Sequence, residues 1–365
     1  MYDIALELLR KLTDANFEAY IIGGFVRDYL LDLHSNDIDV TTNATPKEII
    51  DIFKSDFKPK IDYGSVKLIY RGIRFEITTY RREIGSSDNR HPDSIEYIDS
   101  LEEDLKRRDF TINTICMDKD GNIIDLLGAR KDLNNKLIKC IGDPNVRFRD
   151  DSLRILRAIR FAAALDFELD KDIVNSIDES KKYLHSLSYN RKKEELDKMF
   201  TCKNASKAIK MLLDFGLDKE LELDRLKDVK VTNSLIGIWA ILNVTDKYPF
   251  TSNEKDLIDD INKVLELDNF DDEVLYKYGL YVNSVAGEIK GLDLKEMSDK
   301  YEHLIIHNRD ELTIDGDDII STINEEPGPY ISEIYHDIEH KVLRGELDNN
   351  KDTLISYIKD NYDKK

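Results

Sequence analysis

The sequence predicts an α+β protein: an N-terminal α/β head with a small mixed sheet, followed by an all-α remainder. Two observations predict this division. Short runs rich in β-branched and aromatic residues occur between residue 18 and about residue 127, whereas from about residue 145 the apolar residues recur at helical spacing. The 365 residues exceed one typical domain, so we expect about two or three compact units.

The first seventeen residues, MYDIALELLRKLTDANF, predict an amphipathic helix. Asp3 and Glu7 interrupt its apolar residues, which argues against a signal peptide. No apolar run approaches the roughly 18 residues that would span a bilayer, so we expect no membrane segment and a cytoplasmic location. Three cysteines, Cys116, Cys140 and Cys202, lie far apart without metal-ligand spacing, and we expect them to be reduced.

Five runs predict the strands of the head: AYIIGG (19–24), DIDVTT (37–42), SVKLIYRG (65–72), RFEITTY (74–80) and TINTICMD (111–118), the last followed by GNIIDLL. Later segments predict helices: DSLRILRAIRFAAAL (151–165), NRKKEELDKMF (190–200), ASKAIKMLLDFGL (205–217) and SLIGIWAILNV (234–244). Breaks are expected near Gly216-Leu217, within 245–256, and at 324–330, where Pro327-Gly-Pro329 should end one helix and begin another.

The charge distribution narrows the function. A formal net charge of -20 argues against a protein that coats nucleic acid nonspecifically, although it leaves room for a local basic groove. Arginines concentrate within one stretch of fourteen residues: Arg147, Arg149, Arg154, Arg157 and Arg160. Because arginine suits bidentate contacts with phosphates and base edges, the chemistry is expected in the N-terminal half.

The motif GGFVRD follows the apolar run AYII. Paired glycines, Gly23 and Gly24, allow a tight turn that brings backbone N–H groups close to a phosphate, and Arg27 can add charge-assisted contacts. A strand-to-helix turn without any ligand explains the same six residues equally well. Neither a GxGxxG pattern nor a Walker lysine is present.

The motif NDIDV carries two aspartates, Asp37 and Asp39, whose side chains point the same way in a strand and could share divalent cations. A calcium loop is disfavoured because Thr42 stands where such a loop needs glycine. A plain exposed acidic turn stays open. Glu76 in RFEITTY supplies a third carboxylate, which matters only if its strand lies beside the aspartates, since two nearby metal ions need several oxygen ligands.

The segment EEDLKRRDFTINTICMD places Arg107, Arg108 and Asp109 where a helix gives way to a β-like run. The functional interpretation is triphosphate or ribose binding by Arg108, with Asp109 as the group that orients it. The alternative is a surface salt-bridge cluster, which would contribute little energy.

The densest signal is RFRDDSLRILRAIRF. Asp151, Arg154, Arg157 and Arg160 recur every three residues, which on a helix forms a ribbon with Asp151 and Arg154 adjacent. A carboxylate acceptor beside a guanidinium donor can pair with the Watson–Crick edge of cytosine or adenine. An ion pair on a solvated helix is the alternative, but it leaves three arginines on one ribbon unexplained.

Together, in this order and spacing, the motifs GGFVRD, DID, FEITTY, RRDFTIN and RFRDDSLRILRAIRF resemble those of the class II nucleotidyltransferases, the superfamily of CCA-adding enzymes and bacterial poly(A) polymerases. The resemblance covers nearly the whole chain. Even the segment from ELTIDGDDII to DTLISYI looks like the C-terminal region of the shorter bacterial CCA-adding enzymes.

The resemblance implies a role for each matching position. Asp37 and Asp39 would hold two Mg²⁺ ions, with Glu76 as the third active-site carboxylate. Nucleotide binding would fall to eight residues: Gly24, Arg27, Arg108, Asp109, Asp151, Arg154, Arg157 and Arg160. Within that set, Asp151 and Arg154 would read the incoming base in place of a template.

The resemblance also implies the reaction and the domains. The reaction would be template-independent, Mg²⁺-dependent addition of C, C and A to the 3′ end of tRNA from CTP and ATP, with release of pyrophosphate, by a monomer or homodimer. The implied domains are a polymerase-like nucleotidyltransferase head (1-140), a helical neck with the base-reading helix (141-205), a helical body (206-300) and a helical tail that binds tRNA (301-365).

Three departures keep alternatives open. The flexible loop of the family, here RREIGSSDNRHPDSIEY, has Ser86 and Ser87 where an aromatic residue is usual, so CC-only or A-only addition stays possible beside full CCA addition. Asp150 and Asn190 stand where relatives often have glutamate. A poly(A) polymerase ranks second because the chain lacks extra basic sequence, and a noncatalytic RNA-binding relative is disfavoured because Asp37, Asp39 and Arg108 are intact.

Overall fold

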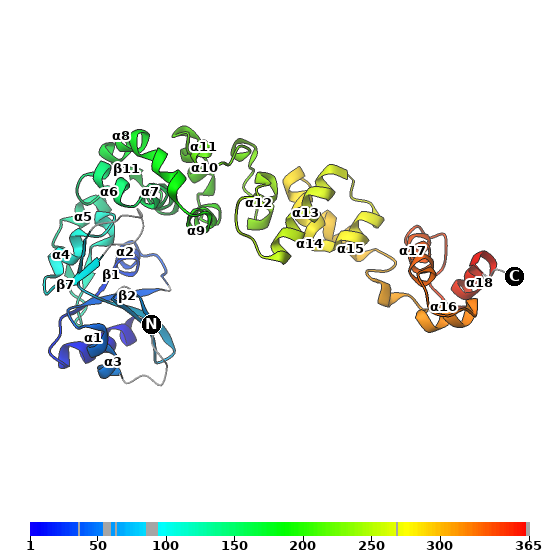
Figure 1. The fold of residues 1–365 in the computed structure, drawn as a ribbon, viewed down its shortest axis with the longest axis horizontal. Helices are drawn as coiled ribbons and strands as arrows, with labels where there is room; N and C mark the ends of the chain where they lie inside the picture. The colour runs from blue at the N-terminus through cyan, green and yellow to red at the C-terminus, as the bar shows by residue number, and fades with distance from the viewer. Residues whose placement is uncertain (36, 54–59, 63, 85–93, 268, 363–365) are drawn as a thin grey trace. The chain divides into compact units, whose positions relative to one another are not determined.

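The computed structural model describes residues 1–35, 37–53, 60–62, 64–84, 94–267 and 269–362. The chain divides into two compact units, Met1–Leu226 and Lys227–Lys365 (Figure 1). This agrees with the expectation of about two or three units. The predicted domain boundaries after residues 140, 205 and 300 stay predictions.

A mixed seven-stranded sheet forms the centre of the head, in the order β3-β4-β5-β2-β1-β8-β9. Its strands are β1 (Ala19–Ile22), β2 (Ile38–Thr42), β3 (Lys60–Asp62), β4 (Ser65–Tyr70), β5 (Ile73–Thr79), β8 (Cys116–Met117) and β9 (Ile123–Ile124). β2 and β5 run parallel, while the other pairs of neighbours are antiparallel. A separate hairpin joins β6 (Arg81–Ile84) to β7 (Ser94–Tyr97). The predicted mixed sheet is therefore confirmed.

The register of β2 decides which side chains share a face. Asp39 lies opposite Ile22 of β1 on one side and opposite Glu76 of β5 on the other. The alternation of strand side chains buries Ile38 and Val40, so Asp39 points to the opposite face. Glu76 therefore lies beside Asp39, as the hypothesis of a shared carboxylate site requires.

The helices of the head are α1 (Tyr2–Asp14), α2 (Gly24–Leu30), α3 (Pro46–Phe53), α4 (Leu101–Lys106) and α5 (Ala129–Asn134). The apolar face of α1 buries Leu8, Leu9 and Leu12, which confirms the predicted amphipathic helix. In Figure 1, α1 and α3 lie together on one side of strands β1 and β2, and α2 lies on the other. The face of the sheet on the side of α1 and α3 is part of the core. On the other face, the glycine turn before α2 lies next to Asp39.

Two sequence-based expectations were wrong, one in the head and one in the region after it. The run 111–118 forms a 3₁₀ turn, η1 (Thr111–Asn113), before the short strand β8, because Thr114 Oγ1 donates to the Thr111 carbonyl at 2.7 Å and competes with strand pairing. The predicted all-α region also contains a strand, β11 (Glu168–Leu169), which pairs in parallel with β10 (Leu137–Ile138). The remainder of that region is helical.

The rest of the first unit consists mainly of α6 (Pro144–Asp150), α7 (Leu153–Leu165), α8 (Lys171–Ser180), η2 (Lys181–Ser186), α9 (Tyr189–Phe200), α10 (Ala205–Asp214) and α11 (Leu217–Glu220). The expectation that Asp151 lies on one helix with the three following arginines was wrong. Asp151 has extended backbone (φ -150, ψ 102) between α6 and α7, and its Oδ1 accepts from the Leu153 N–H at 3.1 Å. The side chain therefore acts like a cap at the start of α7.

The second unit contains α12 (Leu235–Leu242), α13 (Ser252–Leu267), α14 (Asp272–Lys290), α15 (Leu294–Glu302), η4 (Arg309–Glu311), α16 (Gly316–Ile323), α17 (Tyr330–Leu343) and α18 (Lys351–Tyr362). Apolar residues of α16, α17 and α18 share one core, including Ile319, Ile338 and Ile358. The break expected at 324–330 separates α16 from α17. Across the described ranges, no helix is both long and apolar enough to cross a membrane.

Candidate active site

One cavity of about 820 Å³ in the first unit collects every residue that the sequence singled out for the site. The predicted residues that line it are Gly24, Arg27, Asp37, Asp39, Glu76, Arg108, Asp109, Asp151, Arg154, Arg157 and Arg160. Gly23, the first glycine of the candidate phosphate turn, lines it too, as do Asn113, Phe161 and Lys198, which the sequence had not assigned to the site. Segments far apart in the chain thus meet around a single polar space, which we call the main cavity.

Three acidic residues, Asp37, Asp39 and Glu76, form what we call the carboxylate wall. Asp37 directly precedes β2, Asp39 lies within it, and the parallel pairing with β5 sets Glu76 next to Asp39. The Asp39 carboxylate is accessible from the cavity. Glu76 forms an ion pair with Lys67 of β4 at 3.1 Å, and both side chains of this pair are exposed.

The negative charge on Asp39 is unfavourable in the folded protein. Protein surrounds its carboxylate although the side chain meets solvent in the cavity, so desolvation raises the pKa of Asp39, and Arg108 offsets this only in part. The neighbouring charges of Glu76 and Asp37 raise the pKa of Asp39 further. Within the described part of the chain, no hydrogen bond or ion pair reaches the side-chain carboxylate of Asp37 or Asp39. A cation bound here would relieve this unfavourable charge.

The donor set of the carboxylate wall fits a magnesium ion. Mg²⁺ prefers hard oxygen ligands and is usually held by one or two carboxylates, with substrate phosphates and water in the other positions. Asp37 and Asp39 provide two such carboxylates. No group of three or more histidine, cysteine, aspartate or glutamate side chains in the described residues is arranged to hold a metal ion by itself. Asp37 and Asp39 would therefore supply two of the oxygen ligands of such an ion.

The glycine turn brings the start of α2 against the carboxylate wall. Gly23 has φ 78 and ψ -136, a conformation that side chains other than glycine rarely adopt. A Cβ added there would lie 3.5 Å from Asp39 Oδ2. Arg27, one turn later, is buried and donates from Nη1 to Asn113 Oδ1 at 2.8 Å and from Nε to Asp28 at 2.8 Å. Its guanidinium is therefore fixed toward the main cavity.

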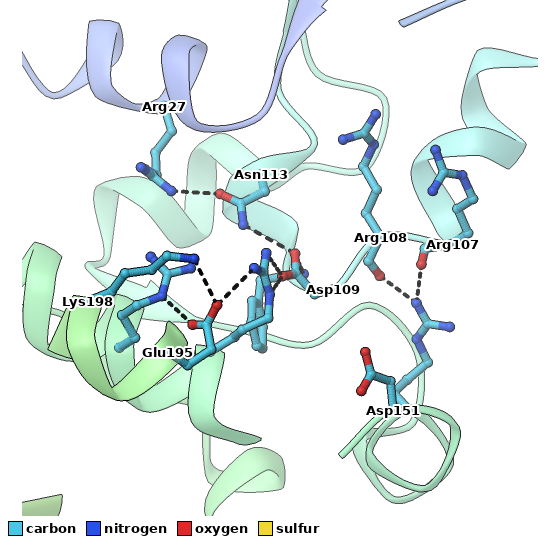
Figure 2. A network of polar contacts seen from close by, with 12 residues as sticks. Arg27, Arg107, Arg108, Asp109, Asn113, Asp151, Glu195 and Lys198 are labelled. Carbon is cyan, nitrogen blue, oxygen red and sulfur yellow. Dashed lines mark hydrogen bonds and ion pairs between the residues drawn. The ribbon is translucent and has the colours of Figure 1, made fainter. Parts of the chain in front are cut away.

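Arg154, Arg157 and Arg160 of α7 form what we call the arginine wall. Its central member, Arg157, contacts Asp109 Oδ2 from Nε at 2.8 Å and from Nη2 at 2.6 Å. Asp109 also accepts from the Phe110 N–H and from Asn113, which links it to Arg27 (Figure 2). Burial would raise the pKa of Asp109, but Arg157 and these hydrogen bonds lower it to about 2.

Glu195 of α9 is a second anchor of the arginine wall, and the sequence analysis missed it. Its carboxylate accepts from Arg160 Nε at 2.6 Å and lies within 3.8 Å of Arg157 and 3.4 Å of Lys198 (Figure 2). Burial would raise the pKa of Glu195, but Arg160 and Arg157 lower it. A signal was available, because Glu195 sits among the buried residues of an amphipathic helix, where a charge needs a partner.

Phe161 was also missed. Its buried ring lines the main cavity, and three guanidinium carbons lie near the ring centroid: Arg160 at 4.1 Å, Arg27 at 5.2 Å and Arg157 at 5.4 Å. Such cation–π contacts favour fixed guanidinium positions. The ring therefore joins the arginine of the glycine turn to those of α7.

The expectation that Asp109 orients Arg108 was wrong. Arg108 instead contacts Asp104, a fully buried carboxylate of α4, at 3.3 Å, and Asp104 also accepts from Arg107 at 2.8 Å. The Asp109 carboxylate accepts instead from Arg157 and Asn113. The Arg108 Nε is buried and, in the described part of the chain, lacks a hydrogen-bond partner, which leaves a donor for a bound anion.

Asp151 and Arg154 both line the main cavity, but they do not pair with each other in the described structure. Asp151 Oδ2 accepts from Arg191 of α9 at 2.9 Å, and Arg154 donates to the Arg147 carbonyl at 3.0 Å. The Asp151 and Arg154 side chains thus have different hydrogen-bond partners. Their remaining hydrogen-bonding atoms are available to the cavity. The segment around Asn190, whose role the sequence left open, contributes the arginine that positions Asp151.

The predicted flexible loop falls mostly outside the described residues. Its two altered positions, Ser86 and Ser87, and its RHPD ending lie within 85–93, so the expectation for them stays a prediction. The flanking strands, β6 and β7, are described and pair in register from Arg81 with Tyr97 to Ile84 with Ser94.

Family models match three parts of the chain. The model described as the poly(A) polymerase head domain matches residues 19–139, and one described as a probable RNA- and SrmB-binding site of polymerase A matches residues 166–225. A third, described as a putative tRNA nucleotidyltransferase domain 2, matches residues 243–358.

Relatives match nearly end to end. The CCA-adding enzyme of Ligilactobacillus salivarius is 34% identical over 97% of this chain and 95% of its own length, and that of Staphylococcus haemolyticus is 34% identical over 99% and 98%. Among solved structures, the CCA-adding enzyme of Bacillus stearothermophilus in complex with CTP superposes with a TM-score of 0.88 at 27% identity, covering 98% of this chain and 97% of that one.

Proposed function

The chain belongs to the family of CCA-adding enzymes with a poly(A) polymerase head domain, and we propose that it adds C, C and A to the 3′ end of tRNA from CTP and ATP. The observation that carries this conclusion is the single cavity lined by carboxylates on one side and by arginines on the other. A relative was solved with CTP, and structures of the same fold were solved with ATP and with tRNA, which supports these substrates.

In the proposed reaction, the 3′ oxygen of the tRNA forms a bond to the α-phosphorus of CTP or ATP. The bond from that phosphorus to the oxygen leading to the β-phosphate breaks, pyrophosphate departs, and the hydroxyl proton passes to solvent. A divalent cation, which we propose to be Mg²⁺, would lower the pKa of the attacking hydroxyl and stabilise the leaving oxygen. Asp37 and Asp39 would hold it, and Glu76 would complete the acidic face toward the attacking oxygen.

The residues near the glycine turn suit the triphosphate. Gly24 allows close approach of the backbone, while Arg27 is fixed by Asn113 and Asp28 so that its charge faces the cavity. Arg108 brings a further guanidinium with one free buried donor. Because these groups are held before any nucleotide arrives, little reorganisation is needed when the triphosphate binds.

The base is read by Asp151 and Arg154 in this proposal. Cytosine and adenine both present a donor beside an acceptor on their Watson–Crick edges, which a carboxylate and a guanidinium can match. Asp109 and Glu195 keep Arg157 and Arg160 in place behind this pair.

The three cysteines are free, which supports the proposed cytoplasmic location.

The test uses tRNA transcripts that lack A, CA or CCA, incubated with Mg²⁺ and with CTP and ATP singly and together. We expect each transcript to be completed to CCA and no further, as measured by product length on a sequencing gel. Products that stop after CC, gain only A, or carry long A tails would each overturn full CCA addition in favour of a partial enzyme or a poly(A) polymerase.

A further inference from the structure

Asp104 of α4 is a buried carboxylate that takes no direct part in the proposed reaction. Its side chain is fully buried, so solvent does not screen its charge. Oδ1 accepts from Arg107 Nε at 2.8 Å, and Oδ2 accepts from Arg108 Nη2 at 3.3 Å. Both arginines line the main cavity. One buried carboxylate is therefore the partner of two guanidiniums that face the site.

Two further segments hold Asp104 in place. Thr41 of β2 donates from Oγ1 to Oδ2 at 3.2 Å, and the backbone N–H of Arg81, where β6 begins, donates to Oδ1 at 3.2 Å. A carboxylate has about four acceptor positions, and the two arginines, Thr41 and the Arg81 N–H use them all. Asp104 therefore acts on a substrate only through other groups.

The charges at this position are only partly balanced. Burial would raise the pKa of Asp104, but Arg107 and Arg108 lower it below its ordinary value, so the carboxylate is ionised at neutral pH. One negative charge then faces two positive ones. Arg108 Nε is buried and has no hydrogen-bond partner among the described residues. A bound phosphate group can use both the surplus charge and this donor.

We propose that Asp104 is a positioning residue for the nucleotide: it holds the guanidiniums of Arg107 and Arg108 in the orientation that binds the triphosphate, and it does not touch the nucleotide itself. This inference rests on the proposed function, in which Arg108 contacts the triphosphate. Thr41 lies two residues after Asp39 on the same strand, so both side chains share a face of the sheet. The link from Asp104 to Thr41 therefore ties the arginines to the strand of the proposed metal ligand.

Asp104→Asn tests this role, because asparagine keeps the size of the side chain but removes its charge and replaces one acceptor with a donor. We expect the Kd for CTP, measured by equilibrium titration at fixed Mg²⁺ without RNA, to rise about tenfold to a hundredfold, since charge-assisted hydrogen bonds are lost. The Kd for CMP, which lacks the β- and γ-phosphates, should change less than about threefold. A purely structural role would weaken both nucleotides equally and would overturn the proposal, as would unchanged CTP affinity.

The matched control is Glu103→Gln. Glu103 is the adjacent carboxylate on the same helix, but its side chain is exposed, pairs with Lys106 and Arg82, and does not line the main cavity. We expect its CTP affinity to stay within about twofold of the wild type, because exposed ion pairs contribute little. A loss as large as that in Asp104→Asn would show that any change of charge on α4 has this effect, and would contradict a specific role for Asp104.

A double-mutant cycle with Arg108→Gln shows whether Asp104 acts through the arginine. Arg108→Gln alone should weaken CTP binding about as much as Asp104→Asn does. Adding Asp104→Asn to the Arg108→Gln protein should then weaken CTP binding much less than it does in the wild type. Fully additive losses would mean that Asp104 acts independently of Arg108 and would overturn the proposal.

Thr41→Val is the second variant if Asp104→Asn does not fold. It removes one donor to Asp104 Oδ2 and leaves the charge of the carboxylate in place. We expect its CTP affinity to fall about twofold to fivefold while its CMP affinity stays the same, since one hydrogen bond to the positioning group is lost. Equal CTP affinity in Thr41→Val and the wild type would overturn the proposal.

Extension of tRNA separates a failure of this inference from a failure of the proposed function. A wild type that binds CTP and never extends tRNA contradicts the proposed function. A wild type that completes tRNA to CCA, beside an Asp104→Asn protein with wild-type CTP affinity, contradicts only the role of Asp104. A loss confined to tRNA affinity, followed by fluorescence anisotropy without nucleotide, would assign the two arginines to RNA and would likewise overturn that role.

Discussion

The two walls of the main cavity differ in whether their charged side chains have partners of opposite charge. On the carboxylate wall, the side-chain carboxylates of Asp37 and Asp39 have no hydrogen-bonding or ion-pair partner in the described part of the chain, and the pKa of Asp39 is raised. On the arginine wall, Arg157 and Arg160 are held by the buried carboxylates Asp109 and Glu195, and the pKa of Asp109 falls to about 2.

This difference suits the two walls to different roles. An uncompensated carboxylate pair is unstable by itself and becomes favourable when a cation arrives, so it suits a group that must bind and release a metal in each cycle. Guanidiniums that are already paired keep one geometry and leave only their outer donors for a ligand, so they suit selection of a base. We therefore propose that the uncompensated carboxylates take part in the chemistry and that the compensated arginines select the base.

The largest expected effect comes from Asp39→Asn. We expect the rate of nucleotide addition to fall by at least about a thousandfold, because a metal contact contributes several kcal/mol and each 1.36 kcal/mol is a factor of ten. Single-turnover extension of a tRNA transcript at saturating Mg²⁺ measures this. Wild-type activity in this variant would show that Asp39 does not hold the metal.

The same variant should be more stable than the wild type without metal. A carboxyl group whose pKa is raised in the folded state favours folding at low pH, and this contribution is lost as the pH rises through the folded pKa. At neutral pH the charge on Asp39 therefore opposes folding, and asparagine removes it. Thermal unfolding in the presence of a chelator should give a higher Tm for Asp39→Asn. A lower Tm would contradict the account of the carboxylate wall.

Asp109→Asn should have the opposite effect on stability. Breaking a buried ion pair costs about 3 kcal/mol, and here it leaves Arg157 with a weaker partner. Because the pKa of Asp109 is lowered from 3.8 to about 2, its ionic contribution is complete above the ordinary value and is lost as the pH falls toward about 2. Denaturant unfolding from pH 7 to pH 2 should show the variant and the wild type converging at the acid end. A constant difference would mean that packing alone is responsible.

Arg154→Ala should change the choice of nucleotide more than the rate. A good bidentate contact to a base contributes about 1–3 kcal/mol of discrimination, so we expect the preference for CTP and ATP over UTP and GTP to fall about tenfold to a hundredfold. Competitive incorporation with all four nucleotides measures it. An unchanged preference would remove Arg154 from the base-reading role.

The smallest expected effect comes from Lys67→Ala. The Lys67–Glu76 pair is exposed, so its loss should change the free energy of unfolding by less than about 1 kcal/mol. Removing a cation beside the carboxylate wall should lower the Mg²⁺ concentration needed for half-maximal activity by up to about fivefold. If that concentration rises instead, Lys67 assists the metal site and does not compete with it.

Periodicity and motif order predicted the head sheet and the helical remainder. Every residue that the motifs singled out for the site lines the main cavity, but other lining residues, such as Asn113, Phe161 and Lys198, were missed. Local sequence could not supply the parallel pairing of β2 with β5, because that register joins segments separated by the whole of α3, β3 and β4. The resemblance to a family only implied that Glu76 belongs with the two aspartates.

The partners of the charged site residues were harder to predict from the sequence than the residues themselves. Sequence proximity suggested that Asp109 orients Arg108, yet the nearest carboxylate after folding is Asp104, one helical turn earlier. Asp151 was expected on the helix of the arginines, but it has extended backbone between α6 and α7, and its side chain accepts from the Leu153 N–H at the start of α7. Such choices depend on which groups become buried together, and spacing along the chain does not determine that.

The central claim is that one wall performs the chemistry and the other selects the nucleotide. Its most direct test measures, for the wild type, Asp39→Asn and Arg154→Ala, both the single-turnover rate of CTP addition and the relative affinities for the four nucleotides. The account predicts that Asp39→Asn loses the rate and keeps the preference for CTP and ATP, while Arg154→Ala loses the preference and keeps more of the rate. A result in which Asp39→Asn changes the preference, or Arg154→Ala abolishes the rate with the preference intact, would contradict it.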